Sequence, residues 1–291
     1  MLAGAVLFWG TSFVAIKTAL GSFSPMAVNW LRMVVASLVF APFWFKIRRP
    51  DHRRGDWKVL LLAAACIPCL YYLFEGYALR LTTSSQAGVI SAVVPLLVAG
   101  GAWLFLRERL SWRGAVAIAV SLAGVAVLSL GGPAVASASN PLLGDSLELL
   151  AMVAAAGSTL AIKHLSARYD PWLLTGLQAA VGVVFFAPMA LASGPATWLS
   201  APPIAWACVV YLGVAVSLGA FGLYNSALKL MPASRASLSI NLVPAVAIVA
   251  GWALLGESLS IVQIVACAVV VGAVVLAESG PDPVPVEEPL G

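Results

Sequence analysis

The sequence predicts an all-α integral membrane protein whose ten transmembrane helices form two inverted-topology five-helix repeats. Three observations predict this fold. Of the 291 residues, 62% are hydrophobic and 10% are charged, whereas a soluble domain is about 45–50% apolar and about 25% charged. Apolar runs of about 20 residues, the length that crosses a bilayer, follow one another with short polar breaks. The two halves of the chain also match each other in register.

Ten apolar runs are expected to span the membrane. Those of the first half are Leu2 to Leu20, Met26 to Lys46, Trp57 to Leu79, Ser84 to Leu106 and Trp112 to Ser129. A Gly, Pro, Ser and Ala-rich linker at 131–141 separates them from Leu142 to Lys163, Pro171 to Ala192, Pro203 to Lys229, Ala233 to Leu255 and Ile261 to Ala277. The first run lacks the basic region and cleavage site of a signal peptide and is therefore interpreted as a helix. The Pro and Glu-rich tail at 280–291 is expected to be disordered.

The distribution of basic residues predicts the orientation in the membrane. With a cytoplasmic N-terminus, thirteen Lys and Arg residues fall on the cytoplasmic side and two, Lys17 and Arg80, on the other. Basic loops stay inside, so both termini are expected in the cytoplasm of a cell with a cytoplasmic (inner) membrane. The net charge of +4 then belongs to loops beside the lipid bilayer, and no nucleic-acid partner is expected.

The internal match defines two repeats, residues 1–130 and 142–279. An offset of 146 pairs Ala15-Ile16-Lys17 with Ala161-Ile162-Lys163 and Pro25 with Pro171. An offset of 149 pairs Val94-Pro95 with Val243-Pro244, and it also pairs Trp103 with Trp252 and Glu108 with Glu257. Five helices per repeat is an odd number, so the second repeat enters the membrane from the opposite side. Inverted repeats are the architecture of alternating-access carriers.

Several segments also carry a family resemblance. They are FWGTSFVAIK at 8–17, LRMVVA at 31–36, ALRLTTSSQAGVISAVVP at 78–95, FLRERL at 105–110, ALKLMPASRASLSINLVP at 227–244 and LGESL at 255–259. Together they resemble the EamA-like branch of the drug/metabolite transporter superfamily, over nearly the whole chain. The resemblance implies a ten-helix fold whose members export amino acids and other metabolites, some of them nucleotide sugars or drugs. The last helix departs from the pattern, because no glycine follows Gln263 closely.

Two charges are expected well inside the membrane, Arg32 and Glu75, which makes Glu75 the one carboxylate in the core. A charge in hydrocarbon costs about 2.5–3.5 kcal/mol by insertion scales, so each needs a partner, a water-filled cavity or a function. At similar depth they can form a structural ion pair, or they can bind a substrate or a proton. Separation from Arg32 would let Glu75 take a proton. Their counterparts in the second repeat, Gln178 and Tyr224, are polar and uncharged.

Further candidates for substrate binding are polar or aromatic residues at membrane depth: Trp9, Tyr77, Asn225 and Asn241. A buried amide without partners is costly, which favours Asn225 and Asn241. Ordinary helix contacts are the alternative for each of them.

For the prolines, lysines, turns and cysteines a structural role is expected, and the prolines also have a functional alternative. Pro95 and Pro244 are expected mid-helix, either as static kinks or as gating hinges. Lys17 and Lys163 are expected to reach the lipid headgroups. The turns at 107–109 and 256–258 are expected to be solvated. The four cysteines are interpreted as buried small hydrophobes rather than metal ligands.

The leading functional hypothesis is a secondary transporter that exports a small-molecule substrate, amino-acid-like in character, without a cofactor. A facilitative permease or channel and a drug exporter are alternatives, although the first span lacks the carboxylate of small multidrug exporters. A membrane-embedded enzyme would need clustered His, Asp or Glu in the spans. Small residues spaced four apart in the fifth and tenth spans, such as Ala119 and Ala123, suit close contact within a monomer or in a homodimer.

Overall fold

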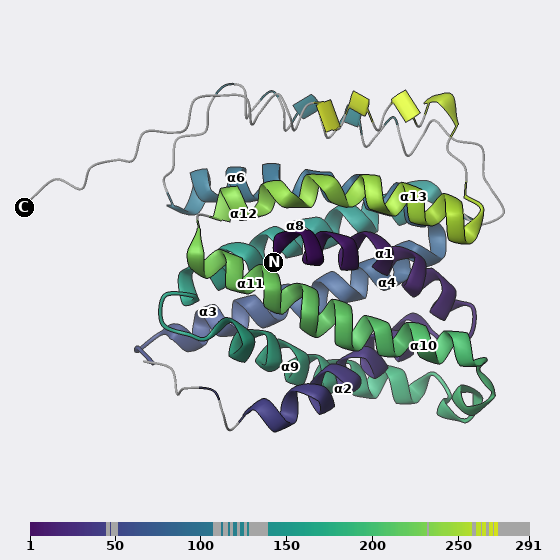
Figure 1. The fold of residues 1–291 in the computed structure, drawn as a ribbon, viewed down its shortest axis with the longest axis horizontal. Coiled ribbons are helices and arrows are strands. Elements are labelled where there is room, and N and C mark those ends of the chain that lie inside the picture. The colour runs from purple at the N-terminus through teal and green to yellow at the C-terminus, as the bar shows by residue number, and fades with distance from the viewer. Residues whose placement is uncertain are drawn as a thin grey trace, which may run out of the picture.

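The computed structural model describes residues 1–44, 47, 52–106, 139–231, 233–257 and 260, and separate positions within 112–127 and 261–272. Every regular element in this part of the chain is a helix, and the helices lie side by side with their axes close to horizontal in Figure 1. Seven of them are long and apolar enough to cross a membrane. The fifth and tenth expected spans, most of the linker and the tail fall largely outside the described residues.

The helix bounds follow the apolar runs closely. The α-helices are α1 (Leu2–Leu20), α2 (Pro25–Trp44), α3 (Asp56–Ala64), α4 (Tyr71–Leu81), α5 (Ser84–Ile90), α6 (Val94–Leu106), α8 (Pro141–Leu165), α9 (Pro171–Ala192), α10 (Pro203–Tyr211), α11 (Phe221–Leu230), α12 (Ala233–Leu238) and α13 (Val243–Leu255). Short 3₁₀ segments are η2 (Ser91–Val93), η3 (Pro195–Ser200) and η5 (Ser239–Leu242), and π-helical segments are η1 (Ala65–Leu70) and η4 (Leu212–Ala220). The bounds of α1 and α9 are those that the sequence predicts.

Polar caps and glycines explain where several helices start and stop. Asp170 precedes Pro171 and accepts hydrogen bonds from the amides of Trp172 and Leu173, while Asn140 precedes Pro141 and accepts one from Leu143. A side-chain acceptor followed by proline is favourable at a helix start, because the first amides lack helical partners. Thr83 and Gln86 form a capping box at the start of α5. Gly256, with φ of 65°, ends α13.

Four of the spans are interrupted at their middles, in two similar pairs. A π-helical segment joins α3 to α4 and another joins α10 to α11, and a 3₁₀ turn joins α5 to α6 and another precedes α13. Pro95 and Pro244 stand at the second position of α6 and α13, directly after those 3₁₀ turns. Pro95 therefore lies near the middle of its span, as expected, and Pro244 holds the equivalent position; the 3₁₀ turn before each proline marks the place where the regular hydrogen-bond pattern is interrupted.

Side-chain contacts at the helix ends establish that α1 and α8 run in opposite directions. Near the C-terminal end of α1, Lys17 donates to the carbonyl of Thr82, just after α4 ends. At the N-terminal end of α8, the amide of Asn140 donates to the carbonyl of Leu81 at 3.1 Å. One end of α1 and the opposite end of α8 therefore meet at the same point, the end of α4.

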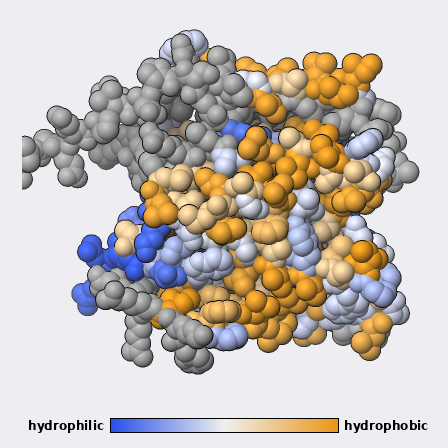
Figure 2. All heavy atoms as spheres, viewed as in Figure 1, coloured by the Kyte–Doolittle hydropathy of each residue, from blue (hydrophilic) through white to orange (hydrophobic). Residues whose placement is uncertain are grey.

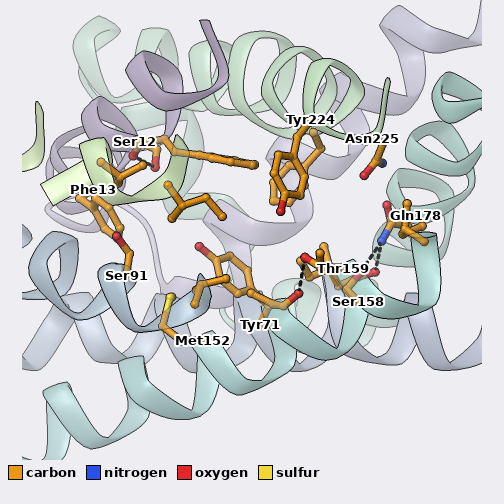
Figure 3. Close-up of a pocket in the computed structure, with 18 residues that line it drawn as sticks. Ser12, Phe13, Tyr71, Ser91, Met152, Ser158, Thr159, Gln178, Tyr224 and Asn225 are labelled. Carbon is orange, nitrogen blue, oxygen red and sulfur yellow. Dashed lines mark hydrogen bonds between the residues drawn. The ribbon is translucent and has the colours of Figure 1, made fainter. Parts of the chain in front are cut away.

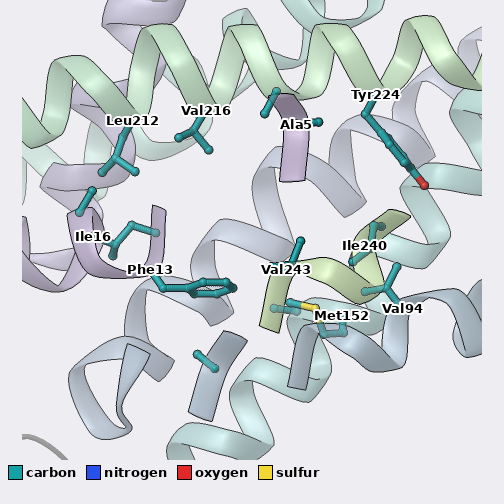
Figure 4. Close-up of a cluster of buried hydrophobic side chains, with 14 of the residues drawn as sticks. Ala5, Phe13, Ile16, Val94, Met152, Leu212, Val216, Tyr224, Ile240 and Val243 are labelled. Atoms are coloured by element: carbon teal, nitrogen blue, oxygen red, sulfur yellow. The ribbon is translucent and has the colours of Figure 1, made fainter. Parts of the chain in front are cut away.

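The core is apolar and draws on both halves of the chain. Phe13 and Ile16 of α1, Met152 of α8, and Leu212 and Val216 of η4 converge in one buried cluster (Figure 4). Many large apolar side chains are exposed on the described helices, and on the face shown in Figure 2 strongly hydrophilic residues gather at one edge, near the start of α3. His52, Arg53 and Arg54 are exposed there. Apolar flanks with a polar edge are the surface expected of a protein that spans a bilayer.

Candidate functional site

A cavity of about 60 Å³ lies between the helices of the first and second halves (Figure 3). This is room for several water molecules. Nine of the eighteen residues that line it are apolar, and the other nine form a set whose side chains carry a polar group. That set comprises Trp9, Ser12, Tyr71, Ser91, Ser158, Thr159, Gln178, Tyr224 and Asn225. An apolar cavity with a few convergent polar groups is the usual form of a small-molecule site.

Five pairs of positions related by the sequence repeat contribute both of their members to the cavity wall. These pairs are Trp9 with Ala155, Ser12 with Ser158, Phe13 with Thr159, Ser91 with Ile240, and Val94 with Val243. The offsets of 146 and 149, found without any coordinates, thus bring matching positions of the two halves to one place.

Several polar groups of the cavity are fixed by contacts between the halves. Gln178 donates from Nε2 to the carbonyl of Ile67 at 2.8 Å and to Ser158 Oγ at 3.2 Å. The backbone of Ile67 is extended, with φ of −129° and ψ of 122°, which leaves its carbonyl without a helical donor. Asn225 donates from Nδ2 to Thr175 Oγ1 at 2.9 Å. These bonds hold the amide side chains in fixed orientations at the wall.

Trp9 differs, because its indole Nε1 is buried and has no hydrogen-bond partner among the described residues. Its ring makes edge contacts with Phe221 and Tyr224, at centroid distances of 5.3 and 5.1 Å. A buried donor without an acceptor is costly. Trp9 is therefore a group that a ligand in the cavity could satisfy.

Arg32 and Glu75 are brought together as an ion pair, with Arg32 Nη1 3.5 Å from Glu75 Oε2 and both side chains buried. Neither lines the cavity. Arg32 also donates from Nε to Ser217 Oγ at 2.9 Å and lies over the ring of Tyr72, 4.1 Å from its centroid. Tyr71, which does line the cavity, donates its hydroxyl to Glu75 at 2.7 Å. The pair thus lies behind Tyr71, separated from the cavity by that ring.

The expectation that Glu75 is the one carboxylate in the core is wrong. Asp145 and Glu148 of α8 are 1% and 0% exposed. Thr82 donates its hydroxyl to Asp145 Oδ1 at 2.6 Å, whereas neither carboxyl oxygen of Glu148 has a hydrogen-bond partner in the described part of the chain. Both acids stand inside the apolar run that predicts the sixth span, so the rule that singles out Arg32 and Glu75 also applies to them.

Two further expectations are corrected at the end of the bundle where α4 ends. Glu257 does not lie in a solvated turn: it is 8% exposed and accepts hydrogen bonds from the amides of Ser84 and Ser85 at 3.0 and 2.9 Å. Lys17 does not extend to the headgroups but bonds the Thr82 carbonyl and lies 3.8 Å from Glu257. Lys163 likewise donates to the carbonyl of Leu228, in the last turn of α11, and to that of Met231, directly after α11 ends.

The remaining expected site residues do not line the cavity. Tyr77 is 43% exposed on the surface of α4. Asn241 stands in the 3₁₀ turn η5, next to Ile240, which lines the cavity. Pro95 and Pro244 are buried, each directly after Val94 or Val243 of the cavity wall. The Ile67 carbonyl and Ser217 are not among the expected site residues. Pro68, which follows Ile67 inside the third apolar run, is a sequence signal for the break there, whereas nothing in the printed residues marks Ser217.

A multi-pass helical membrane protein with a cavity between its halves is the class of protein that the fold and site define. The sequence pattern of the EamA-like transporter family matches residues 1–130 and again residues 142–278. The chain belongs to this family, and it is a transporter rather than an enzyme.

Known proteins support the same assignment. An uncharacterized transporter of Bacillus subtilis, YetK, is 26% identical over 99% of this chain and 89% of its own length. An uncharacterized transporter of Archaeoglobus fulgidus is 30% identical, covering 90% of this chain and 91% of that one. The probable terminal-alkyne amino-acid exporter of Streptantibioticus cattleyicolor is 30% identical over 87% of this chain and 83% of that one. A crystal structure with 22% identity matches 95% of this chain and 94% of its own at a TM-score of 0.62, which shows a shared fold alone.

Proposed function

We propose that the protein is a secondary transporter that exports amino acids or closely related small metabolites across the cytoplasmic membrane by alternating access. The observation that carries this proposal is the cavity wall, to which five register-equivalent pairs contribute both members. In an inverted-repeat carrier, the substrate binds where the two repeats meet, and the halves exchange conformations to open each side in turn.

Three further observations support the two inverted repeats. The α1 and α8 helices, which start the two halves, run in opposite directions. The π-helical segments η1 and η4 and the 3₁₀ turns η2 and η5 recur at equivalent places. Lys17 and Lys163 bind carbonyls at equivalent positions, those of Thr82 and Met231. On this basis we take residues 1–130 and 142–279 as the two repeats.

The proposed topology places both termini and the loop before α3 in the cytoplasm. The exposed basic residues before α3 support it. A C-terminal fusion to alkaline phosphatase, which is active only outside the cytoplasm, should be inactive. The same fusion made after Ser22, between α1 and α2, should be active. The opposite pair of results would reverse the topology.

The amino-acid assignment is supported by the printed name of the Streptantibioticus relative and by the chemistry of the cavity. The side-chain oxygens of Ser12, Ser158 and Asn225 offer acceptors for an amino group, while apolar residues such as Met152 and Ile162 accommodate a side chain. Trp9, Gln178 and Tyr224 complete the proposed binding set. The Arg32–Glu75 pair lies behind Tyr71 and orients that residue of the cavity wall through the hydrogen bond from Tyr71 to Glu75.

Counterflow in proteoliposomes tests this function. Vesicles loaded with one unlabelled amino acid at a time, from a panel of the common twenty, are placed in a trace of the same labelled compound. A carrier transiently accumulates the label, whereas a passive channel only equilibrates it. The substitution Trp9→Phe, which removes the indole donor but keeps a ring, should weaken the apparent affinity. Trp103→Phe is the matched control, because Trp103 is 53% exposed on α6. Absence of counterflow with every amino acid would refute the assignment.

A further inference from the structure

Glu148 is the buried ionisable group that the proposed transport mechanism does not yet use. It is 0% exposed, and neither of its carboxyl oxygens has a hydrogen-bond partner among the described residues. The α8 helix that carries it packs closely along α4. An ionised carboxylate in such a place would be shielded from bulk solvent and would have no donor in the described part of the chain to stabilise it.

The titratable groups around Glu148 do not supply a positive charge. The acidic neighbours of Glu148 are Asp145, one turn earlier on α8, and Glu75 of α4, which accepts a hydrogen bond from Tyr71. Two cations lie near this cluster and both have other partners: Arg32 is paired with Glu75 and bonded to Ser217, and Lys17 bonds the Thr82 carbonyl and lies against Glu257. Thr82 donates to Asp145. Every member of the cluster except Glu148 therefore has a partner.

Glu75, Arg32 and Glu148 lie at a similar depth in the helix bundle, so we treat them as one site. Glu75, Arg32 and Glu148 each lie about 10 Å from the end of their own helix, at a rise of 1.5 Å per residue. Those helix ends, at Leu81, Pro25 and Pro141, belong to the side of the bundle opposite the basic edge in the proposed topology. Glu148 thus lies at the depth of the Arg32–Glu75 pair without a cation of its own, and a second ionised carboxylate near Glu75 is disfavoured by like-charge repulsion.

We propose that Glu148 is a proton-binding site, and that it is protonated in the conformation described here. The proton keeps the carboxyl neutral while it is buried away from solvent. If the protein is the carrier proposed above, release of this proton to water and its return from the other side would couple transport to the proton gradient. Met152, one turn after Glu148, and Tyr71, bonded to Glu75, both line the cavity. A structural change in the cavity can therefore be transmitted to the acidic residues through the Tyr71 ring and through the helical turn between Met152 and Glu148.

Infrared spectroscopy of the purified protein tests the proposal without any substrate. A protonated carboxyl has a C=O stretching band above the amide I region, and an ionised one does not. At neutral pH, we expect this band in the parent protein and its loss in Glu148→Gln. The matched control Glu75→Gln should keep it, because Glu75 is the acid paired with Arg32. A band that persists undiminished in Glu148→Gln, or that is lost in Glu75→Gln, would overturn the assignment.

Thermal unfolding gives a second readout from the same variants. If the folded state holds a proton that the unfolded chain releases, the unfolding temperature falls as the pH rises from mildly acidic to mildly alkaline. Glu148→Gln should flatten this fall, and Glu75→Gln should not. Equal falls in the parent and in Glu148→Gln would contradict a proton on Glu148. Neither measurement depends on counterflow, so a failed proton site and a failed transport function are distinguishable.

Discussion

At the residue scale, Glu257 shows how one buried carboxylate joins segments that are distant in sequence. It follows α13 and accepts hydrogen bonds from two amides at the start of α5 and from the hydroxyl of Ser85. The unpaired amides at a helix start carry partial positive charge, so an anion there is stabilised. Lys17 of α1 lies against the same carboxylate. Three segments are thus fastened at one end of the bundle.

We predict that acid weakens this junction. Burial raises the pKa of Glu257, but the hydrogen bonds from Ser84 and Ser85 outweigh it and hold the pKa below the ordinary value of 4.5. A carboxyl with a lowered folded-state pKa stabilises the protein above pH 4.5, and this contribution is lost as the pH falls through the folded-state value. Glu257→Gln should cost about 1–3 kcal/mol at neutral pH, because a neutral amide satisfies the buried amides less well.

Unfolding temperatures of detergent-solubilised protein, followed from neutral to acidic pH, measure both effects. The parent should lose stability toward acid more steeply than Glu257→Gln. Ser85→Ala is the matched control, because it removes one hydroxyl donor and leaves the titrating group in place. Parallel curves for the parent and Glu257→Gln would contradict the prediction.

Glu148 shows what the sequence could and could not reveal at this scale. Its position inside an apolar run marks it as a costly charge, just as Arg32 and Glu75 are marked, and that signal is available in the printed residues. The absence of any donor around it is a property of packing, since α4 and α8 are far apart in the chain. No residue pattern contains that information.

At the element scale, apolar length predicts where the described helices begin and end, but not where they are broken inside. Pro95 and Pro244 do mark two of the breaks. Pro68 likewise marks the break at Ile67, but the group that satisfies the freed carbonyl is the Gln178 amide of another helix, 111 residues away. Local propensity cannot show which side chain, distant in the sequence, donates a hydrogen bond to a buried backbone carbonyl.

Removal of that partner should destabilise the protein. Gln178→Leu leaves the Ile67 carbonyl buried without a donor, which should cost about 1–3 kcal/mol. Ser158→Ala, which removes a bond to the same side chain but leaves the carbonyl satisfied, should cost less. Chemical or thermal denaturation of the two variants in the same detergent compares them. A smaller loss for Gln178→Leu than for Ser158→Ala would show that the carbonyl finds another donor.

Packing of α2 against α9 gives a prediction about two elements. A methyl group added at Gly176 would lie 2.0 Å from Cε1 of Phe40, so the helices are in contact at this glycine. Gly176→Ala should destabilise the protein by about 1–3 kcal/mol through overpacking. Phe40→Leu in the same chain should recover part of the loss, so unfolding free energies of the two single variants and the double variant should be non-additive. Additive effects would mean that the helices move apart at no cost.

At the scale of the whole molecule, the two halves meet around the cavity, and alternating access requires their contact to change. The cavity wall includes residues of the inner half of the membrane in the proposed topology, such as Thr159 and Asn225. At the opposite end, the bonds of Lys17, Glu257 and Asp145 join α1, α5 and α8. These contacts favour an interpretation of the structure as closed outside.

A native cysteine provides a direct test of whether the halves must move. Cys66, in η1 of the first half, is buried, and a Cβ atom added at Gly157 of α8 would lie 3.0 Å from its sulfur. The Cβ of one cysteine lies at a similar distance from the partner sulfur in a disulfide, given an S–S bond of about 2.05 Å. Gly157→Cys should therefore form a disulfide with Cys66 under mild oxidation, seen as the loss of two free thiols without a change in oligomer size.

If transport requires η1 and α8 to separate, oxidation should abolish counterflow and a reductant should restore it. Gly157→Ser, which adds a side chain of similar size, and the double variant Gly157→Cys with Cys66→Ser should both be insensitive to oxidant. Full counterflow in the oxidised, cross-linked protein would show that these two elements move together, and alternating access would then need a different pair of surfaces.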